Sequence, residues 1–324
     1  MLKDRFGRTI DYMRVSITDR CNLRCAYCMP DGIAPAPAEA LLTGGEIAFV
    51  CRQAASLGID RFKLTGGEPL VRPDCAKLVA ALKGIGGVRQ VTLTTNGVLL
   101  RARLDELLDA GLDAVNVSLD TTDRAQYRAI TGVDALEAVM ASIRAAAGRL
   151  PVKINCVAQD GVNADAPLSL AALARELPVD VRFIEMMPVG AGKRRKTVPN
   201  ADILATIERA YGRTVPDDRA HGNGPAVYRR AEGFLGGIGF ISAVSGGFCR
   251  DCNRLRLMST GELKPCLCYA DAIPLRDILR GAEGDRERRV REKIIQAVRS
   301  KPEAHCFEHP DVVTEDREMA RIGG

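Results

Sequence analysis

The chain has 324 residues, of which 46% are hydrophobic and 27% charged, so its composition is that of an ordinary folded protein and excludes global disorder. Charges begin at Lys3 and no apolar run reaches about 18 residues, so we expect no signal peptide, no membrane span and a cytoplasmic location. The net charge of +5 permits an anionic ligand, whereas 4% aromatic residues supply few stacking platforms for nucleic acid, which we do not expect as a partner.

Short β-rich segments alternate with Ala- and Leu-rich segments of helical spacing in the first part of the chain. The predicted strands are Met13–Thr18, Arg61–Thr65, Val91–Thr95, Ala114–Asp120, Val152–Ala158 and Val181–Met186. The predicted helices between them are Gly45–Leu57, Asp74–Lys83, Arg101–Ala110, Leu136–Ala147 and Leu168–Leu177. Six β-then-α units indicate an α/β fold with right-handed crossovers. We therefore predict an incomplete parallel (β/α)6 barrel over residues 1–190, with functional groups at the C-terminal strand ends.

The pattern changes after Met187, and residues 191–324 are predicted to form a second, C-terminal region. Its predicted elements are an exposed basic loop at Gly190–Asn200, a helix at Ala201–Tyr211, antiparallel strands at Phe234–Val244 and Leu255–Ser259, and a charged helix at Arg280–Arg299. The tail that follows is polar and ends in two glycines, Gly323 and Gly324.

Eleven cysteines in a chain without an export signal favour free thiols or metal ligands over a disulfide framework. Cys21, Cys25 and Cys28 follow the first predicted strand with the spacing C-x3-C-x2-C. Three thiolates on one loop can hold three irons of a [4Fe–4S] cluster and leave the fourth iron open to a chelating small molecule. A zinc site is the alternative, but it lacks a fourth ligand nearby, and all three histidines lie beyond residue 220.

A glycine-rich segment, Leu64-Thr-Gly-Gly-Glu-Pro-Leu70, follows the second predicted strand. Glycines let the backbone approach a ligand closely, and backbone carbonyls accept from an ammonium group. Together with the spacing of the first cysteine group and the aromatic Tyr27 before its third cysteine, this segment resembles the radical S-adenosylmethionine (SAM) family. The resemblance implies that SAM chelates the open iron and is cleaved by one electron to methionine and a 5′-deoxyadenosyl radical.

A second cysteine group, Cys249, Cys252 and Cys266, has the spacing C-x2-C-x13-C. It fits either a second three-thiolate cluster or a zinc ribbon in which Cys268 is the fourth ligand. The remaining cysteines lack a metal-binding pattern, and we expect them to behave as small hydrophobic residues. They are Cys51, Cys75, Cys156, Cys268 and Cys306.

The segment from Ile238 to Arg256 and the tail from Met319 to Gly324 resemble the molybdenum cofactor biosynthesis protein A family, the GTP 3′,8-cyclases. The resemblance covers essentially the whole chain. It implies two [4Fe–4S] clusters, the second of which binds the guanine of GTP. The deoxyadenosyl radical then abstracts the ribose 3′ hydrogen, and attack on C8 of the purine gives 3′,8-cyclo-7,8-dihydro-GTP.

The resemblance also implies partners and site residues. A reductant protein such as flavodoxin or ferredoxin supplies electrons, cyclic pyranopterin monophosphate synthase acts downstream, and the chain is a monomer or a homodimer. The implied GTP contacts are Arg14, Lys63, Thr94, Lys153, Arg182, Arg254 and Arg256. The implied SAM contacts are Tyr27, Gly67, Ser118 and Met187, and the tail residues Gly323 and Gly324 are implied to reach the substrate.

The residues themselves favour an anionic nucleotide. Arg254 and Arg256 are two apart on a predicted strand and point to one face, where their guanidinium groups suit phosphate oxygens. Lys63, Lys153 and Arg182 fall in predicted barrel strands, where buried cations are costly without partners. Two other functions fit the motifs less well. One is a different two-cluster radical SAM enzyme, such as a peptide-modifying maturase, and the other is a non-catalytic zinc-ribbon module.

Overall fold

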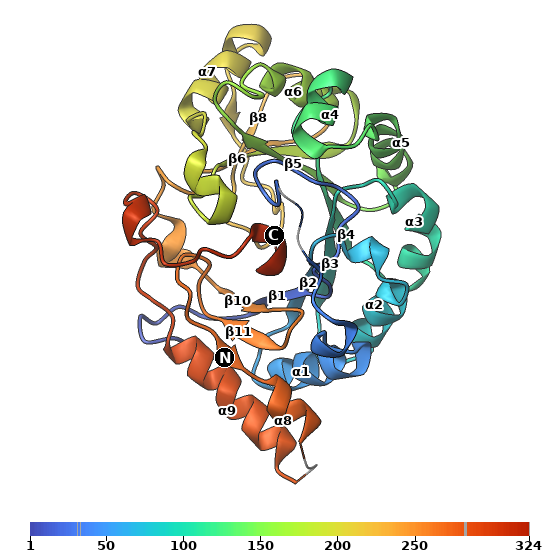
Figure 1. Cartoon of the computed structure of the whole chain (residues 1–324). Coiled ribbons are helices and arrows are strands. Elements are labelled where there is room, and N and C mark those ends of the chain that lie inside the picture. Colours follow the sequence, from blue (N-terminus) through green and yellow to red (C-terminus); the bar gives the residue numbers. More distant parts are fainter. Residues whose placement is uncertain (31, 33, 282–283, 324) are drawn as a thin grey trace.

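The structure is a computed structural model, and it describes residues 1–30, 32, 34–281 and 284–323. Its centre is a curved parallel sheet that carries helices on its outer face (Figure 1). The six successive barrel strands are β1 (Tyr12–Ser16), β2 (Arg61–Thr65), β3 (Gln90–Thr95), β4 (Ala114–Ser118), β5 (Val152–Ala158) and β6 (Val179–Glu185). The helices between them are α1 (Gly44–Ser56), α2 (Cys75–Lys83), α3 (Leu100–Asp109), α4 (Arg124–Thr131), α5 (Leu136–Ala146) and α6 (Ala166–Glu176).

Each of the six predicted strands and five predicted helices of the barrel is present within two residues of its expected bounds. The sequence prediction missed α4, because this helix has only eight residues and buries only Tyr127, Ile130 and Thr131. Its ends do carry sequence signals. Asp123 accepts a hydrogen bond from the Gln126 backbone N–H at 2.7 Å, and Gly132 ends the helix with a left-handed φ of 74°.

The C-terminal region widens the sheet at both edges. β9 (Ile238–Ile241) pairs in parallel with β6, and β10 (Arg254–Leu257) pairs in parallel with β1. The two predicted C-terminal strands do have antiparallel neighbours, β8 (Val227–Arg230) and β11 (Glu262–Lys264), but their parallel pairing with the barrel was not predicted. The cause is long-range docking, because residues some 240 positions apart become strand neighbours. The outermost strands are β7 (Val215–Pro216) and β12 (Ile273–Pro274).

Alternation along the barrel strands separates a packed outer face from a polar interior. In β1 and β2 the fully buried Met13, Val15 and Leu64 face the helices, whereas Arg14 and Lys63 point to the opposite side. The outward residues join one core that extends beneath the surrounding helices. The inward positions are therefore free to carry charged side chains, which a packed barrel interior would exclude.

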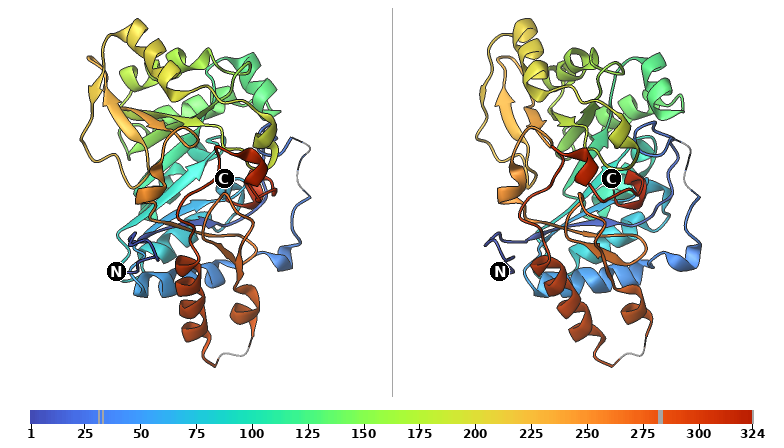
Figure 2. Two further views of the ribbon diagram at one scale, coloured as in Figure 1. Left: turned by 90° about the vertical axis from the view of Figure 1, so that its left-hand side faces the viewer. Right: turned by 60° about the vertical axis from the view of Figure 1, so that its left-hand side comes forward.

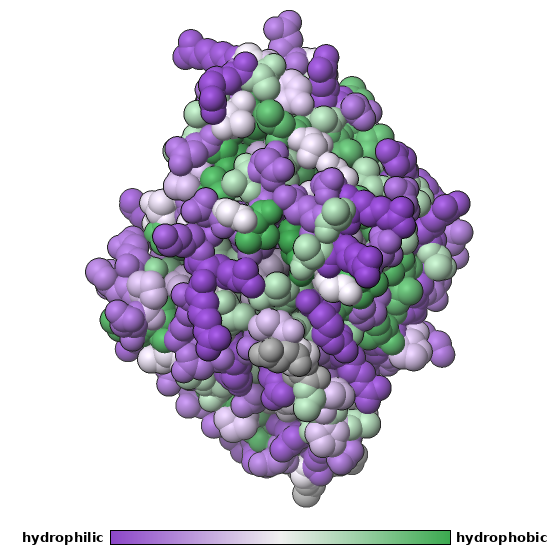
Figure 3. All heavy atoms as spheres, turned by 45° about the horizontal axis from the view of Figure 1, so that its top comes forward, coloured by the Kyte–Doolittle hydropathy of each residue, from purple (hydrophilic) through white to green (hydrophobic). Residues whose placement is uncertain are grey.

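The predicted charged helix corresponds to α9 (Arg286–Arg299), whereas Arg280 ends the separate short helix α8 (Arg276–Arg280). These two helices extend away from the barrel, and α7 (Asn200–Tyr211) lies at the opposite end of the molecule (Figure 2). One face of the surface is mostly hydrophilic, with hydrophobic residues in small groups (Figure 3). No helix among the described residues combines the length and the apolarity that a membrane crossing requires.

Candidate active site

The strand register brings three of the predicted cations side by side in the barrel interior. Arg14 in β1 lies opposite Arg256 in β10 on one side and opposite Lys63 in β2 on the other. Further round the sheet, Arg182 in β6 lies opposite Asn155 in β5, and its guanidinium donates to Asn155 Oδ1 at 2.8 and 2.5 Å. The inward-facing positions of successive strands thus assemble a polar belt that no single segment of the sequence displays.

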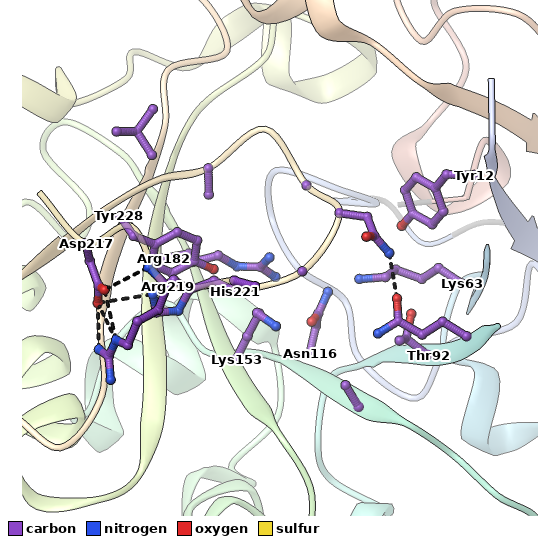
Figure 4. Close-up of a pocket in the computed structure, with 18 of the residues that line it drawn as sticks. Tyr12, Lys63, Thr92, Asn116, Lys153, Arg182, Asp217, Arg219, His221 and Tyr228 are labelled. Atoms are coloured by element: carbon purple, nitrogen blue, oxygen red, sulfur yellow. Dashed lines mark hydrogen bonds and ion pairs between the residues drawn. The ribbon is translucent and has the colours of Figure 1, made fainter. Parts of the chain in front are cut away.

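These side chains line two cavities that share several residues. A cavity of about 310 Å³ is bounded by both cysteine groups and by most of the predicted ligand contacts. Its lining includes Cys21, Cys25, Cys28, Cys249, Cys252, Cys266, Arg14, Lys63, Thr94, Arg182, Arg254, Arg256, Tyr27, Gly67, Ser118 and Met187. A cavity of about 360 Å³ lies at the N-terminal ends of the strands and is lined by Lys63, Lys153 and Arg182 (Figure 4).

The second cavity also involves a loop that the sequence prediction did not assign to the site. Residues 216–224 line it, and His221 Nδ1 lies 2.8 Å from Asp180 Oδ2 while its ring stacks on Tyr228 with centroids 3.8 Å apart. The Asn223 amide donates to Gln90 Oε1 at 2.6 Å. The contacts with Asp180 and Gln90 join segments that are 41 and 133 positions apart, so no local pattern indicates them.

The grouped cations weaken one another's charge. Burial, followed by the positive charges of Arg182 and Arg14, lowers the pKa of Lys63 well below its usual range. Burial, followed by the charges of Arg14 and Arg254, lowers the pKa of Arg256 to about 9. An anionic group between these side chains would oppose both effects, because it favours the charged form of each cation. A bound polyanion would therefore strengthen the charge of both side chains.

The first cysteine group lies on the loop after β1. The Cys28 backbone N–H donates to the Cys25 carbonyl at 2.9 Å, and Cys21 Sγ accepts from the Leu23 N–H at 3.4 Å. Burial raises the pKa of Cys21 and, to about 12, that of Cys28. A metal bound to these thiols would deprotonate them, because its positive charge opposes the effect of burial. The donor set fits three corners of an iron–sulfur cluster.

The glycine-rich segment packs directly against the strand end that leads into Cys21. A Cβ at Gly67 would lie 2.3 Å from the Arg20 carbonyl oxygen, and one at Gly66 would lie 2.5 Å from that of Thr18. Both glycines are thus required for close backbone packing, in addition to the ligand contact predicted for Gly67. Glu68, whose role the sequence prediction left open, is fully buried and accepts from the backbone N–H of Asn96 at 2.6 Å. Burial raises the pKa of Glu68 to about 7.

The three other residues predicted to contact SAM border the same cavity from different strands. Tyr27 Oη donates to Asp120 Oδ2 at 2.8 Å, and burial raises the pKa of Asp120 to about 6. Ser118 ends β4, and Met187 follows the end of β6. Among the predicted GTP contacts, Thr94 Oγ1 accepts from the Asn116 amide at 3.4 Å. Their contacts with ligands remain predictions.

The second cysteine group lines the same cavity and lies near the start of β1, whereas the first group follows the end of that strand. Cys249 lies in a short 3-10 helix, Phe248–Asp251, and its sulfur accepts from the His305 N–H at 3.3 Å. Burial acts to raise the pKa of Cys252, but the positive charges of Arg254 and Lys301 prevail and lower it to about 7. Within the described ranges, no three His, Cys, Asp or Glu side chains are gathered closely enough to hold one metal ion.

The five cysteines without a metal-binding pattern pack among hydrophobic residues, as predicted. Cys51, Cys75 and Cys156 are fully buried in the main core. Cys268 and Cys306 pack in a smaller hydrophobic cluster, and their sulfur atoms lie 2.9 Å apart, a contact that was not predicted. The segment after α9 folds back over the segment after β11, and this joins two residues that are 38 positions apart.

The described part of the tail reaches the barrel strands at Gly323. The Gly323 carbonyl accepts from Thr65 Oγ1 at 3.2 Å and from the guanidinium groups of Arg14 and Arg256 at 3.3 Å each. Ile322 is buried beside it, and the last helical turn lies over the barrel opening in both Figure 1 and Figure 2. Gly324, the other predicted tail residue, lies outside the described residues.

A buried ion pair holds the tail in place. Glu315 is 1% exposed and pairs with Lys264, which is fully buried in β11, and with Arg317 at 2.9 Å. Removing one partner of a buried pair costs about 3–5 kcal/mol when the other is left unpaired. Glu315→Gln leaves Lys264 without its carboxylate, whereas Lys264→Met leaves Glu315 paired with Arg317. We therefore expect a loss of about 3–5 kcal/mol in the free energy of unfolding for Glu315→Gln and a smaller loss for Lys264→Met.

Urea denaturation of the two variants measures this difference. The control is Glu292→Gln, which removes an exposed partner of Arg288 and is expected to cost at most about 1 kcal/mol. Equal losses for Glu315→Gln and Glu292→Gln would contradict the assignment of the tail anchor.

Comparison with known proteins agrees with this architecture. A profile described as "Radical SAM superfamily" matches residues 15–174, and one described as "Molybdenum Cofactor Synthesis C" matches residues 179–307. A solved structure of Streptococcus suis SuiB bound to S-adenosylmethionine has a TM-score of 0.59 and 16% identity, over 80% of this chain and 61% of that one. This likeness confirms the radical SAM fold.

Two curated relatives match along their entire length. The GTP 3′,8-cyclase of Clostridium perfringens strain 13 is 43% identical over 325 residues, and that of Moorella thermoacetica is 44% identical over 328 residues. Each alignment covers 100% of this chain and 100% of the relative. The chain belongs to the GTP 3′,8-cyclase family of radical SAM proteins.

Proposed function

We propose that this chain converts GTP to 3′,8-cyclo-7,8-dihydro-GTP, the first step of molybdenum cofactor biosynthesis. The observation that carries the proposal is a single cavity with a cysteine group on each side and a belt of cations between them. Three thiolates on each side suit two [4Fe–4S] clusters, and the cations suit the triphosphate of a nucleotide between them. A nucleotide held in this way would have its base toward one cluster and its ribose toward the other.

When bound, the clusters and SAM supply the one-electron chemistry that removes the ribose 3′ hydrogen. The residues of the chain position and shield the reactants. Cys21, Cys25 and Cys28 hold the first cluster, and Cys249, Cys252 and Cys266 hold the second. Tyr27, Gly67, Ser118 and Met187 border SAM at the C-terminal strand ends. GTP is bound by the polar and cationic side chains of Arg14, Lys63, Thr94, Lys153, Arg182, Arg254 and Arg256. The tail residues Gly323 and Gly324 close the site.

The same proposal names the proteins that act before and after this enzyme. A reductant protein such as flavodoxin or ferredoxin delivers the electron, and cyclic pyranopterin monophosphate synthase consumes the product in the cytoplasm. Residues 1–190 supply the SAM half of the site, and residues 191–324 supply the second cluster and the tail. A peptide-modifying maturase is the other candidate, but the resemblance to SuiB is one of fold at 16% identity, and the full-length relatives are cyclases.

Anaerobic incubation with GTP, SAM and dithionite tests the proposal. We expect 5′-deoxyadenosine and a cyclised GTP product to form together. Analysis of iron, sulfide and zinc in anaerobically purified protein distinguishes an iron–sulfur enzyme from a zinc-binding module. Zinc near one per chain without visible absorbance would favour the zinc-ribbon module, and deoxyadenosine without a cyclised product from GTP would favour a different substrate.

Removing the paired arginines of β10 is expected to weaken GTP binding. Arg254 and Arg256 flank the buried Leu255, so both point into the cavity. A charge-assisted hydrogen bond to phosphate contributes about 1.5–3 kcal/mol, and about 1.4 kcal/mol is a factor of ten, so Arg254→Ala and Arg256→Ala should each raise the Kd at least about tenfold. Calorimetric titration measures the Kd, with the exposed Arg250→Ala as the matched control. Unchanged affinity in both variants would remove these arginines from the site.

A further inference from the structure

Lys301 is a buried lysine for which the proposed reaction has no stated use. It is 2% exposed and lies two residues beyond the end of α9. A lysine ammonium has three N–H donors, and each has an acceptor within reach. The Arg254 carbonyl is 2.7 Å from Nζ, the Pro265 carbonyl is 3.0 Å away, and Cys252 Sγ is 3.6 Å away.

The three acceptors come from three segments around the second cysteine group. Cys252 is one of the predicted ligands, Pro265 directly precedes the ligand Cys266, and Arg254 begins the strand that carries both substrate arginines. One ammonium therefore ties together segments that are otherwise separated by the β10–β11 hairpin. Its position depends on α9, whose buried residues Ile294 and Val298 pack into the main core.

The charge of Lys301 has no carboxylate partner among the residues that the structure describes. The other fully buried lysine, Lys264, pairs with Glu315. The neighbouring side chains Arg8 and Arg254 are also cationic, and of these Arg8 has its own carboxylate in Asp4. A buried charge without a counter-charge is costly, and an anionic group at the site would offset that cost. Three cysteine thiolates that bind a cluster would provide that negative charge.

We propose that Lys301 is a positioning residue of the second cluster site, which holds the Cys252 and Cys266 segments together and raises the reduction potential of the cluster bound there. The potential of an iron–sulfur cluster depends on local charge and on hydrogen bonds to its sulfur atoms. A cation at a ligand sulfur stabilises the more negative, reduced state. The inference rests on the proposed function only in requiring a cluster at this cysteine group.

The test isolates the second cluster by replacing Cys21, Cys25 and Cys28 with serine in the full-length chain. In this background we compare the unaltered Lys301 with Lys301→Met, Lys301→Arg and the control Lys293→Met, which removes a lysine at the surface of α9. Iron content, far-UV circular dichroism and a redox titration followed by EPR are measured for each. We expect Lys301→Met to shift the midpoint potential to more negative values, and Lys301→Arg and Lys293→Met to shift it less.

Each result separates the possibilities. If Lys301→Met loses the cluster while Lys301→Arg keeps it at equal circular dichroism, the need for a charge at this position is supported. A fully loaded Lys301→Met variant with an unmoved potential, or equal loss of the cluster in Lys301→Met and Lys301→Arg, would overturn the inference. Absence of any cluster in the background with Lys301 intact would instead overturn the assignment of the second cluster, and the inference with it.

Discussion

Replacement of Cys21, Cys25 or Cys28 by serine is expected to abolish SAM cleavage. These three residues lie on one loop and line the cavity from the side of the glycine-rich segment. A three-thiolate cluster has no spare protein ligand, so loss of one thiolate removes the iron that SAM would chelate. The measurement is the yield of 5′-deoxyadenosine with dithionite as the reductant. We expect it to fall to the level seen without enzyme.

Serine variants of the second group are the matched control for this prediction. Cys249→Ser, Cys252→Ser and Cys266→Ser should lose about half of the iron, because one of two clusters is lost. Reductive cleavage of SAM should persist in them, since the first group is untouched, whereas GTP cyclisation should stop. If a first-group variant retained deoxyadenosine formation, the assignment of that loop to SAM would be wrong. If a Cys249 variant retained both clusters and full turnover, Cys249 would not be a ligand.

The parts of the fold and site that the sequence predicted are those with local signals. The barrel strands and helices show a hydrophobic period, and the cysteine spacings and the GGEP segment are short motifs. The inward orientation of Lys63 and Arg256 also followed from simple alternation along a strand. For such features a few neighbouring residues determine the conformation, so the local sequence is enough to predict them.

The features that were missed depend on contacts between distant segments. Three examples join residues that are tens to hundreds of positions apart. They are the parallel pairing of β10 with β1, the contact of Cys268 with Cys306 and the hydrogen bond from Lys301 to Cys252. Buried lysines illustrate the difficulty. Nothing near Lys264 or Lys301 in the sequence says that one will pair with a carboxylate and the other with carbonyls and a sulfur. Only the packing of the tail and of α9 decides it.

Substitution of Gly323 by alanine is expected to suppress GTP cyclisation while both clusters still assemble. Gly323 has a φ of 81°, a conformation that costs an alanine about 1–2 kcal/mol. An added Cβ would also lie 3.2 Å from Ser16 Cβ, which is tight enough to push the tail away. The Gly323 carbonyl would then leave Arg14, Arg256 and Thr65. Two of these are predicted to bind the substrate, so their orientation should be lost with the tail.

Backbone strain alone can be separated from loss of the tail contacts by a second glycine. Gly148 has a nearly identical φ of 82° and nothing within 4 Å of an added Cβ, and it lies in an exposed turn after α5. Gly148→Ala therefore carries the same conformational cost without touching the cavity. We expect it to lower the midpoint of thermal unfolding but to keep the ratio of cyclised product to 5′-deoxyadenosine. In Gly323→Ala the same ratio should fall, because SAM cleavage requires only the first cysteine group. Equal ratios in the two variants would mean that the tail fills the barrel without orienting the substrate.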